Sequence, residues 1–100
     1  MKTIMVVDDE LSILKKVKSC LENDNFDVIT AVNSREAIEI LDKFEENFEL
    51  ILIDTPMPGN RTSAFFSIKP KSKIDSSKLD NFLQKPFTDK ELLNFVKSKM

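Results

Sequence analysis

The order of short apolar segments in the first half of the chain is the feature that most restricts its fold. Residues 3–7 (TIMVV) and 50–53 (LILI) are short β-forming runs, typical of strands buried on both faces. Residues 26–31 alternate as a strand does, and apolar residues recur at helical spacing in residues 11–21 and 37–44. This β-α-β-α-β order predicts a doubly wound α/β fold with a parallel sheet covered on both faces.

The end of the chain predicts one more strand and one more helix. Residues 81–84 (NFLQ) are strand-like and lead into Lys85-Pro86. The sequence from Thr88 to Glu91 has the pattern of a capping box, in which two side chains satisfy free backbone amides at a helix start. Apolar residues then recur through residues 92–96, so a last helix is expected there.

Composition excludes several classes of function. The chain has 100 residues and a net charge of −2, so we expect a single domain over residues 1–100, no nucleic-acid partner and no output domain. It has no histidine, which excludes a histidine base and most zinc sites. No apolar run is long enough to span a membrane, and the single cysteine, Cys20, fits a cytoplasmic protein and a buried position.

Four ionisable residues follow predicted strands. Asp8 and Asp9 follow the first strand, Asp54 follows the third, and Lys85 follows the last. Because sites in doubly wound sheets form outside the carboxyl ends of the strands, these side chains are expected to meet at one edge. Three neighbouring carboxylates repel one another unless a cation compensates, and an oxygen-only cluster suits Mg²⁺. An aspartate beside Mg²⁺ can attack phosphorus and form an acyl phosphate.

Each of these residues also has a simpler interpretation. Asp8 or Asp9 could cap the first helix, because aspartate is a favoured N-cap residue. Asp54 could form an Asx-turn into the following Thr-Pro. Lys85 could be a solvated surface lysine. Phe82, an aromatic residue in the strand that precedes Lys85, could simply pack in the core. The joint pattern, rather than any one residue, favours the chemical interpretation.

Three segments together resemble the signatures of response-regulator receiver domains. They are MVVDDE, LIDTPMP and FLQKPFT, and each lies at the end of an apolar strand in the order typical of that family. The three segments extend from near the start of the chain to near its end, so the resemblance covers nearly all of it. It implies a flavodoxin-like receiver fold with strand order 2-1-3-4-5.

The resemblance also implies roles for individual residues. Asp54 would be the phosphoacceptor, and Asp8 and Asp9 would hold Mg²⁺, with Asp9 as the direct ligand. Pro56, two residues after the phosphoacceptor, would give its backbone carbonyl to the metal.

The Lys-Pro segment has its own implied roles. Lys85 would contact the phosphoryl oxygens, with a cis peptide bond to Pro86. Phe82, three residues earlier, would be the switch aromatic.

The chain departs from the family between Asp54 and Lys85, where it is too short for two parallel crossovers. We favour residues 62–68 (TSAFFSI) as the fourth strand. Ser67 would then be the switch hydroxyl, the preceding helix would be absent, and residues 56–61 would return along the sheet, with a short helix at residues 73–79. Alternatively, residues 60–69 form the third helix, and the fourth strand and helix are lost or reduced.

The favoured interpretation is a shortened receiver domain in a two-component system. A sensor histidine kinase would phosphorylate Asp54, and the domain would catalyse only its own phosphorylation and dephosphorylation. Two alternatives stay open: a non-phosphorylated pseudo-receiver that binds a protein, and a small phosphatase, which the Thr-Pro after Asp54 disfavours. An uncovered sheet face would make a homodimer possible.

Overall fold

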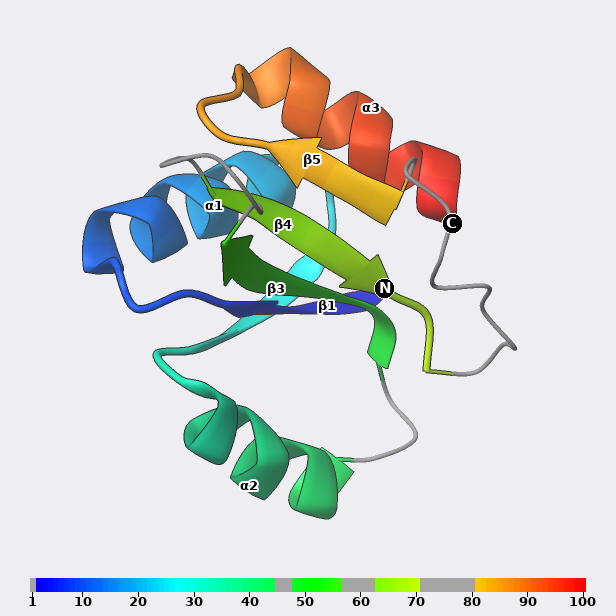
Figure 1. Ribbon diagram of the computed structural model, residues 1–100. Helices are drawn as coiled ribbons and strands as arrows, with labels where there is room; N and C mark the ends of the chain where they lie inside the picture. The colour runs from blue at the N-terminus through cyan, green and yellow to red at the C-terminus, as the bar shows by residue number, and fades with distance from the viewer. Residues whose placement is uncertain (1, 45–47, 57–62, 71–80) are drawn as a thin grey trace.

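Five strands form one open sheet in the order β2-β1-β3-β4-β5, as Figure 1 shows for the computed structural model. The structure describes residues 2–44, 48–56, 63–70 and 81–100. The strands are β1 (Thr3–Val7), β2 (Asp27–Ala31), β3 (Phe48–Pro56), β4 (Ser63–Ile68) and β5 (Phe82–Gln84). The helices are α1 (Leu11–Asn23), α2 (Ser34–Phe44) and α3 (Asp89–Lys99). The expected α/β class and strand order are confirmed.

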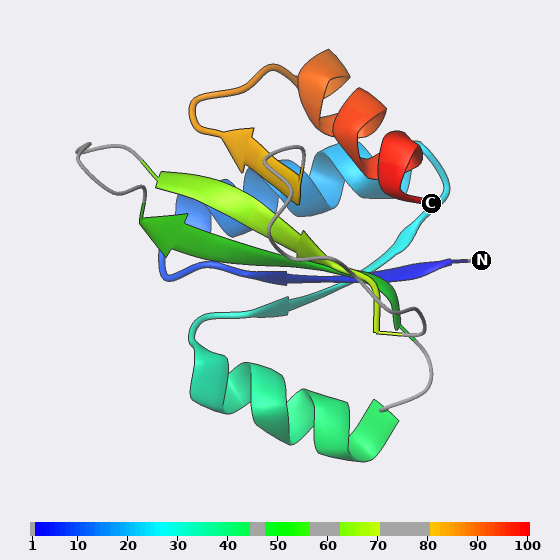
Figure 2. The ribbon, with the colours of Figure 1, turned by 45° about the vertical axis from the view of Figure 1, so that its right-hand side comes forward.

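Helices cover both faces of the sheet, as a doubly wound fold requires. Helices α1 and α3 lie against one face and contact each other, and α2 lies against the opposite face (Figures 1 and 2). None of the described helices combines the length and the apolar character needed to cross a membrane.

Local sequence signals explain where the helices begin and end. Helix α1 ends at Asn23, and Asn25 then adopts a left-handed conformation with φ 69°, which asparagine tolerates better than most residues. Helix α3 begins with the expected capping box. The Thr88 hydroxyl accepts the Glu91 amide at 3.1 Å, and the Glu91 carboxylate accepts the Thr88 amide at 2.9 Å.

The expectation of an all-parallel sheet is wrong at β4. Strand β1 is parallel to β2 and to β3, but β4 runs antiparallel to both of its neighbours, and its arrow points against β3 in Figure 2. Pro56 pairs with Ser63 at one end, and Ile51 pairs with Ile68 at the other. A parallel connection needs a dozen or more residues, whereas residues 57–62 are enough only for a return beside β3.

Both placements of the missing segment therefore need correction. The alternative that made residues 60–69 a helix is wrong, because residues 63–68 form β4. The favoured placement identified the strand, but its return path along the sheet is excluded by the antiparallel register. The short helix expected at residues 73–79 lies outside the described residues.

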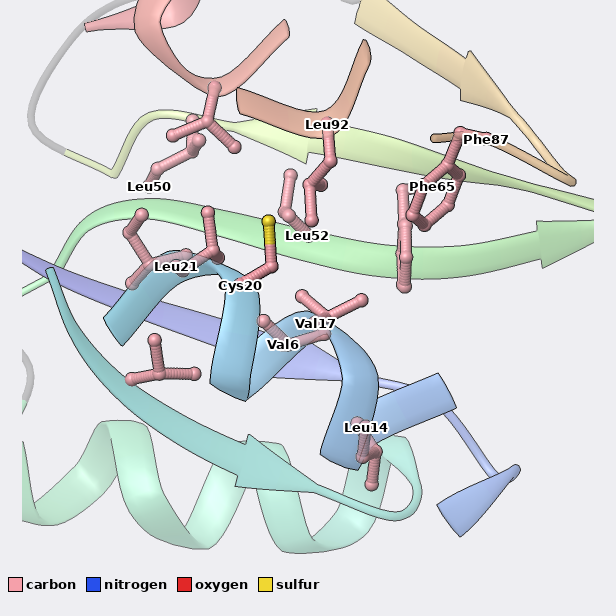
Figure 3. Close-up of a cluster of buried hydrophobic side chains, with 13 residues drawn as sticks. Val6, Leu14, Val17, Cys20, Leu21, Leu50, Leu52, Phe65, Phe87 and Leu92 are labelled. Carbon is pink, nitrogen blue, oxygen red and sulfur yellow. The ribbon is translucent and has the colours of Figure 1, made fainter. Parts of the chain in front are cut away.

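The main core lies between the sheet and helices α1 and α3. Strand residues such as Leu50, Leu52 and Phe65 meet helix residues such as Leu21 and Leu92 there, and all five are fully buried (Figure 3). A second, smaller cluster lies between the sheet and α2. Burial of this apolar surface is the main favourable term in folding, and it holds the ends of β1, β3 and β5 in register at the site described next.

Candidate phosphoacceptor site

The acidic residues after β1 and within β3 meet at one edge of the sheet. One carboxylate oxygen from each of Asp8, Asp9 and Asp54 lies within 4.8 Å of the others. Asp8 is only 2% exposed, whereas Asp54 is half-buried and Asp9 is exposed. The carboxylate pocket is completed by residues at the start of α2, Asn33 and Ser34.

Capping does not account for these carboxylates. The N-cap of α1 is Glu10, whose side chain forms no capping bond. Asp8 instead accepts the backbone amide of Glu10 through Oδ1 at 2.9 Å, which orients its other oxygen toward the cluster. Asp54 lies within β3 and pairs with Phe65, so it does not open a turn.

Lys85 supplies the positive charge of the site. Its Nζ donates to Oδ1 of Asp54 at 2.8 Å and also to Oδ2 of Asp8. The side chain is 14% exposed, and its Nζ lies 4.6 Å from the centre of the Phe65 ring. The peptide bond between Lys85 and Pro86 is cis, as expected. The lysine therefore joins the end of β5 to the acids of β1 and β3.

Two opposing effects act on the pKa of Lys85. Burial disfavours the charged ammonium and acts to lower its pKa. The hydrogen bonds that Lys85 donates to Asp54 and Asp8, together with the negative charge of these carboxylates, outweigh burial and raise the pKa above its ordinary value. Lys85 is thus positively charged at neutral pH and compensates part of the acidic cluster.

The donor set fits a magnesium ion. Mg²⁺ in proteins usually takes one or two carboxylates and keeps several waters, which suits a cluster open to solvent on one side. Among the described residues, none pairs with the Asp9 carboxylate in a hydrogen bond or an ion pair, so it is free to be a direct ligand. The role of the Pro56 carbonyl stays a prediction. Pro56 is the last residue of β3 and is exposed.

Ser67 lies away from this site in the structure, and its switch role stays a prediction. Because β4 is reversed, Ser67 pairs with Leu52, on the far side of Asp54 from the acidic edge. Its hydroxyl is buried and donates to the carbonyl oxygen of Asn81 at 3.2 Å. In this position Ser67 ties the end of β4 to the start of β5.

Phe82 occupies the strand position expected of it. Its ring lies 5.0 Å from that of its cross-strand partner Phe66, and both side chains are half-buried. Neither ring belongs to the two core clusters. The switch role of Phe82 stays a prediction.

Two residues beside Lys85 were not expected from the sequence. The Phe65 ring lies below the ammonium group, and the Ser63 carbonyl oxygen accepts the Lys85 backbone amide at 2.9 Å. Both come from β4, and only its direction decides which end of that strand reaches the site. The short connection after β3 was the sequence feature that could have indicated this direction.

Comparison with known proteins agrees with the fold. A solved receiver-domain structure from Clostridium thermocellum superposes with a TM-score of 0.69 at 23% identity, covering 99% of this chain and 94% of the other. At this identity the likeness concerns the fold alone.

Sequence comparison identifies the family. A transcriptional regulatory protein CpxR homolog of Haemophilus influenzae is 29% identical over 98% of this chain and 50% of its own length. The regulatory protein VanR of Enterococcus faecium is 29% identical over 97% and 49%. This chain thus spans about half the length of these relatives. The response regulator receiver domain model matches residues 4–66, and the chain belongs to this family.

Proposed function

We propose that this domain accepts a phosphoryl group on Asp54 from a sensor histidine kinase, with Mg²⁺ bound beside it. The observation that carries the proposal is the convergence of three carboxylates and one lysine, contributed by three segments distant in the sequence. Three carboxylates this close together repel one another, which lowers the stability of the fold. Such an arrangement is therefore expected where it serves a function.

The contacts of Asp54 support a specific course for the proposed transfer. Lys85 holds Oδ1 of Asp54, so Oδ2 is the oxygen available to attack phosphorus. A new O–P bond forms, the P–N bond of the donor phosphohistidine breaks, and its electron pair leaves with the imidazole. The Lys85 ammonium stabilises the negative charge on the transferred group. A bound divalent cation supplies further charge neutralisation when present.

The domain is proposed to modify only itself, and the output passes to a partner protein. The added charge competes with Asp8 for Lys85, because the lysine contacts both aspartates before transfer. Such competition gives two arrangements of the β5 end, which a partner can distinguish. Phe82, which begins β5, is the proposed reporter of this change.

Intact mass spectrometry tests the proposal. The protein is incubated with Mg²⁺ and a small acyl phosphate, beside Asp54→Ala, an EDTA control and Asp42→Ala as a matched substitution of an exposed acid on α2. We expect one phosphoryl adduct on the wild type and on Asp42→Ala, and none in the other two samples. A folded wild type without an adduct would favour the pseudo-receiver interpretation.

Self-association stays a prediction about the face that carries α2. Phe66 and Phe82 lie outside both core clusters, and among the described helices only α2 lies on the second face (Figure 2). Elution as a monomer in sizing chromatography at high concentration would count against a homodimer.

A further inference from the structure

The hydroxyl groups near Asp54 differ in whether they are free to donate. Thr55 follows Asp54 directly, but its Oγ1 donates to the carbonyl oxygen of Ile53 at 3.1 Å. The Ser67 hydroxyl is committed to Asn81. The Ser63 hydroxyl has no hydrogen-bond partner among the described residues, although its side chain is half-buried. A half-buried hydroxyl of this kind can take a partner that arrives later.

The reversal of β4 places Ser63 at the acidic edge of the sheet. Asp54 pairs with Phe65, and Ser63 pairs with Pro56, two residues further toward that edge. Because side chains alternate along a strand, Ser63 lies on the same face as Phe65, whose ring is 4.6 Å from the Lys85 Nζ. The backbone amide of Lys85 donates a hydrogen bond to the Ser63 carbonyl oxygen at 2.9 Å, which holds the two backbones together.

Ser63 and Lys85 also line the same cavity. This cavity, of about 310 Å³, lies between the start of α1, the start of β4 and the segment after β5. Asp54 does not line this cavity, but it contacts Lys85, which does, and the register places Ser63 beside Pro56, two residues after Asp54. A second hydroxyl, Ser34, lines the separate carboxylate pocket, whose described lining does not include Lys85.

We propose that the Ser63 hydroxyl donates a hydrogen bond to a phosphoryl oxygen on Asp54, beside Lys85. The inference rests on the proposed function and identifies an additional ligand of its phosphorylated state. A phosphoryl group carries several charged oxygens, and donors already positioned around them stabilise it more than mobile water does. Alignment to the family would assign this role to Ser67, whereas the strand direction assigns it to Ser63.

The test compares the two serines, which lie on one face of one strand and at its opposite ends. Ser63→Ala, Ser63→Thr and Ser67→Ala are incubated with Mg²⁺ and a small acyl phosphate, and the rate of adduct formation is followed by intact mass. We expect about a tenfold or greater loss of rate in Ser63→Ala, from loss of a hydrogen bond to a charged group. Ser63→Thr retains the hydroxyl and most of the rate, and Ser67→Ala stays within about twofold of the wild type.

The thermal midpoint of each variant separates chemistry from folding. Ser67→Ala leaves the buried carbonyl of Asn81 without this donor and is expected to lower the midpoint while leaving the rate unchanged. Ser63→Ala should lower the rate of adduct formation and leave the thermal midpoint unchanged. A wild-type rate in Ser63→Ala, or a loss confined to Ser67→Ala, would overturn the inference alone. An unmodified wild type would overturn the proposed function, and this inference with it.

Discussion

At the scale of single residues, Lys85 holds the site together. It is the only described cation that contacts the acidic cluster, and it pairs with the nearly inaccessible carboxylate of Asp8. Removing one partner of a buried pair leaves the other charge uncompensated, which costs far more than the pair contributes. The lysine is therefore structural before any phosphoryl group arrives.

Lys85→Met should lower the free energy of unfolding by about 2 kcal/mol in metal-free buffer, because Asp8 and Asp54 lose their counter-charge. Urea denaturation followed by circular dichroism measures this change. The matched control is Lys97→Met, which breaks an exposed pair with Asp24 (2.9 Å) and should cost about 0.5 kcal/mol. Equal losses in the two variants would show that Lys85 has no special electrostatic role.

Cys20 should react slowly with thiol reagents in the folded protein. Burial, followed by the charges of Asp89 and Asp24, raises the thiol pKa above 9.0, so little reactive thiolate forms at pH 8. The folded thiol keeps its proton where the unfolded one loses it, so its contribution to stability is full below pH 9.0 and declines as the pH rises further. Spectrophotometric thiol titration, with urea-unfolded protein as the reference, tests this; equal rates would contradict it.

At the scale of elements, the direction of β4 decides which residues reach the site. Strand identity follows from the composition of residues 63–68, but direction follows from the length of the connection before them. Reversal exchanges the two ends of the strand, so Ser63 lies at the acidic edge and Ser67 lies away from it.

Engineered cysteine pairs test this direction. In a Cys20→Ala background, Pro56→Cys with Ser63→Cys should form a disulfide on mild oxidation, because the two residues are register partners. Pro56→Cys with Ile68→Cys should not, because Ile68 pairs with Ile51, about 16 Å away along β3. The products are distinguished by non-reducing electrophoresis. Cross-linking of the second pair alone would indicate a parallel β4.

The capping box of α3 should contribute measurably to stability. Thr88→Ala removes the side-chain acceptor of the Glu91 amide and should cost about 1 kcal/mol in urea denaturation. Ser98→Ala is the matched control at the other end of α3. Its hydroxyl donates to the Phe95 carbonyl at an exposed position, so the change should stay within about 0.5 kcal/mol. A loss no larger in Thr88→Ala than in Ser98→Ala would argue against the cap.

At the scale of the whole molecule, the sheet and its helices bring charges from distant segments to one edge. Asp8 and Lys85 are separated by 77 positions in the sequence and are in contact in the fold. The net charge of −2 gives no indication of this local concentration of acid. Metal binding there should stabilise the entire fold, because the unfolded chain has no such site.

Mg²⁺ should therefore raise the thermal midpoint. Mg²⁺ at about one hundred times its dissociation constant stabilises the folded state by about 2.7 kcal/mol. For a domain of this size, this raises the thermal midpoint by roughly 10 °C or more. Differential scanning fluorimetry measures the shift against NaCl at matched ionic strength. Asp9→Asn should abolish most of it, since Asp9 is the exposed carboxylate of the cluster. An unchanged shift in Asp9→Asn would place the ion elsewhere.

Much of this molecule is predictable because its signals are local. The spacing of apolar residues and the caps locate α1, α2 and α3, and the β-forming runs locate the strands. The position of Asp8, Asp9, Asp54 and Lys85 after strands predicts one shared edge, because parallel strands present their ends together. These features depend on neighbours along the chain.

The direction of β4 is different, because it depends on how a short connection closes in space. The residues of β4 pair equally well in either direction by composition, and the short chain between β3 and β4 favours the antiparallel return without fixing the partners. The sequence by itself thus determined the class of fold and the meeting of the three acids and the lysine at one edge of the sheet. Only the tertiary structure decided that Ser63, rather than Ser67, lies beside Lys85.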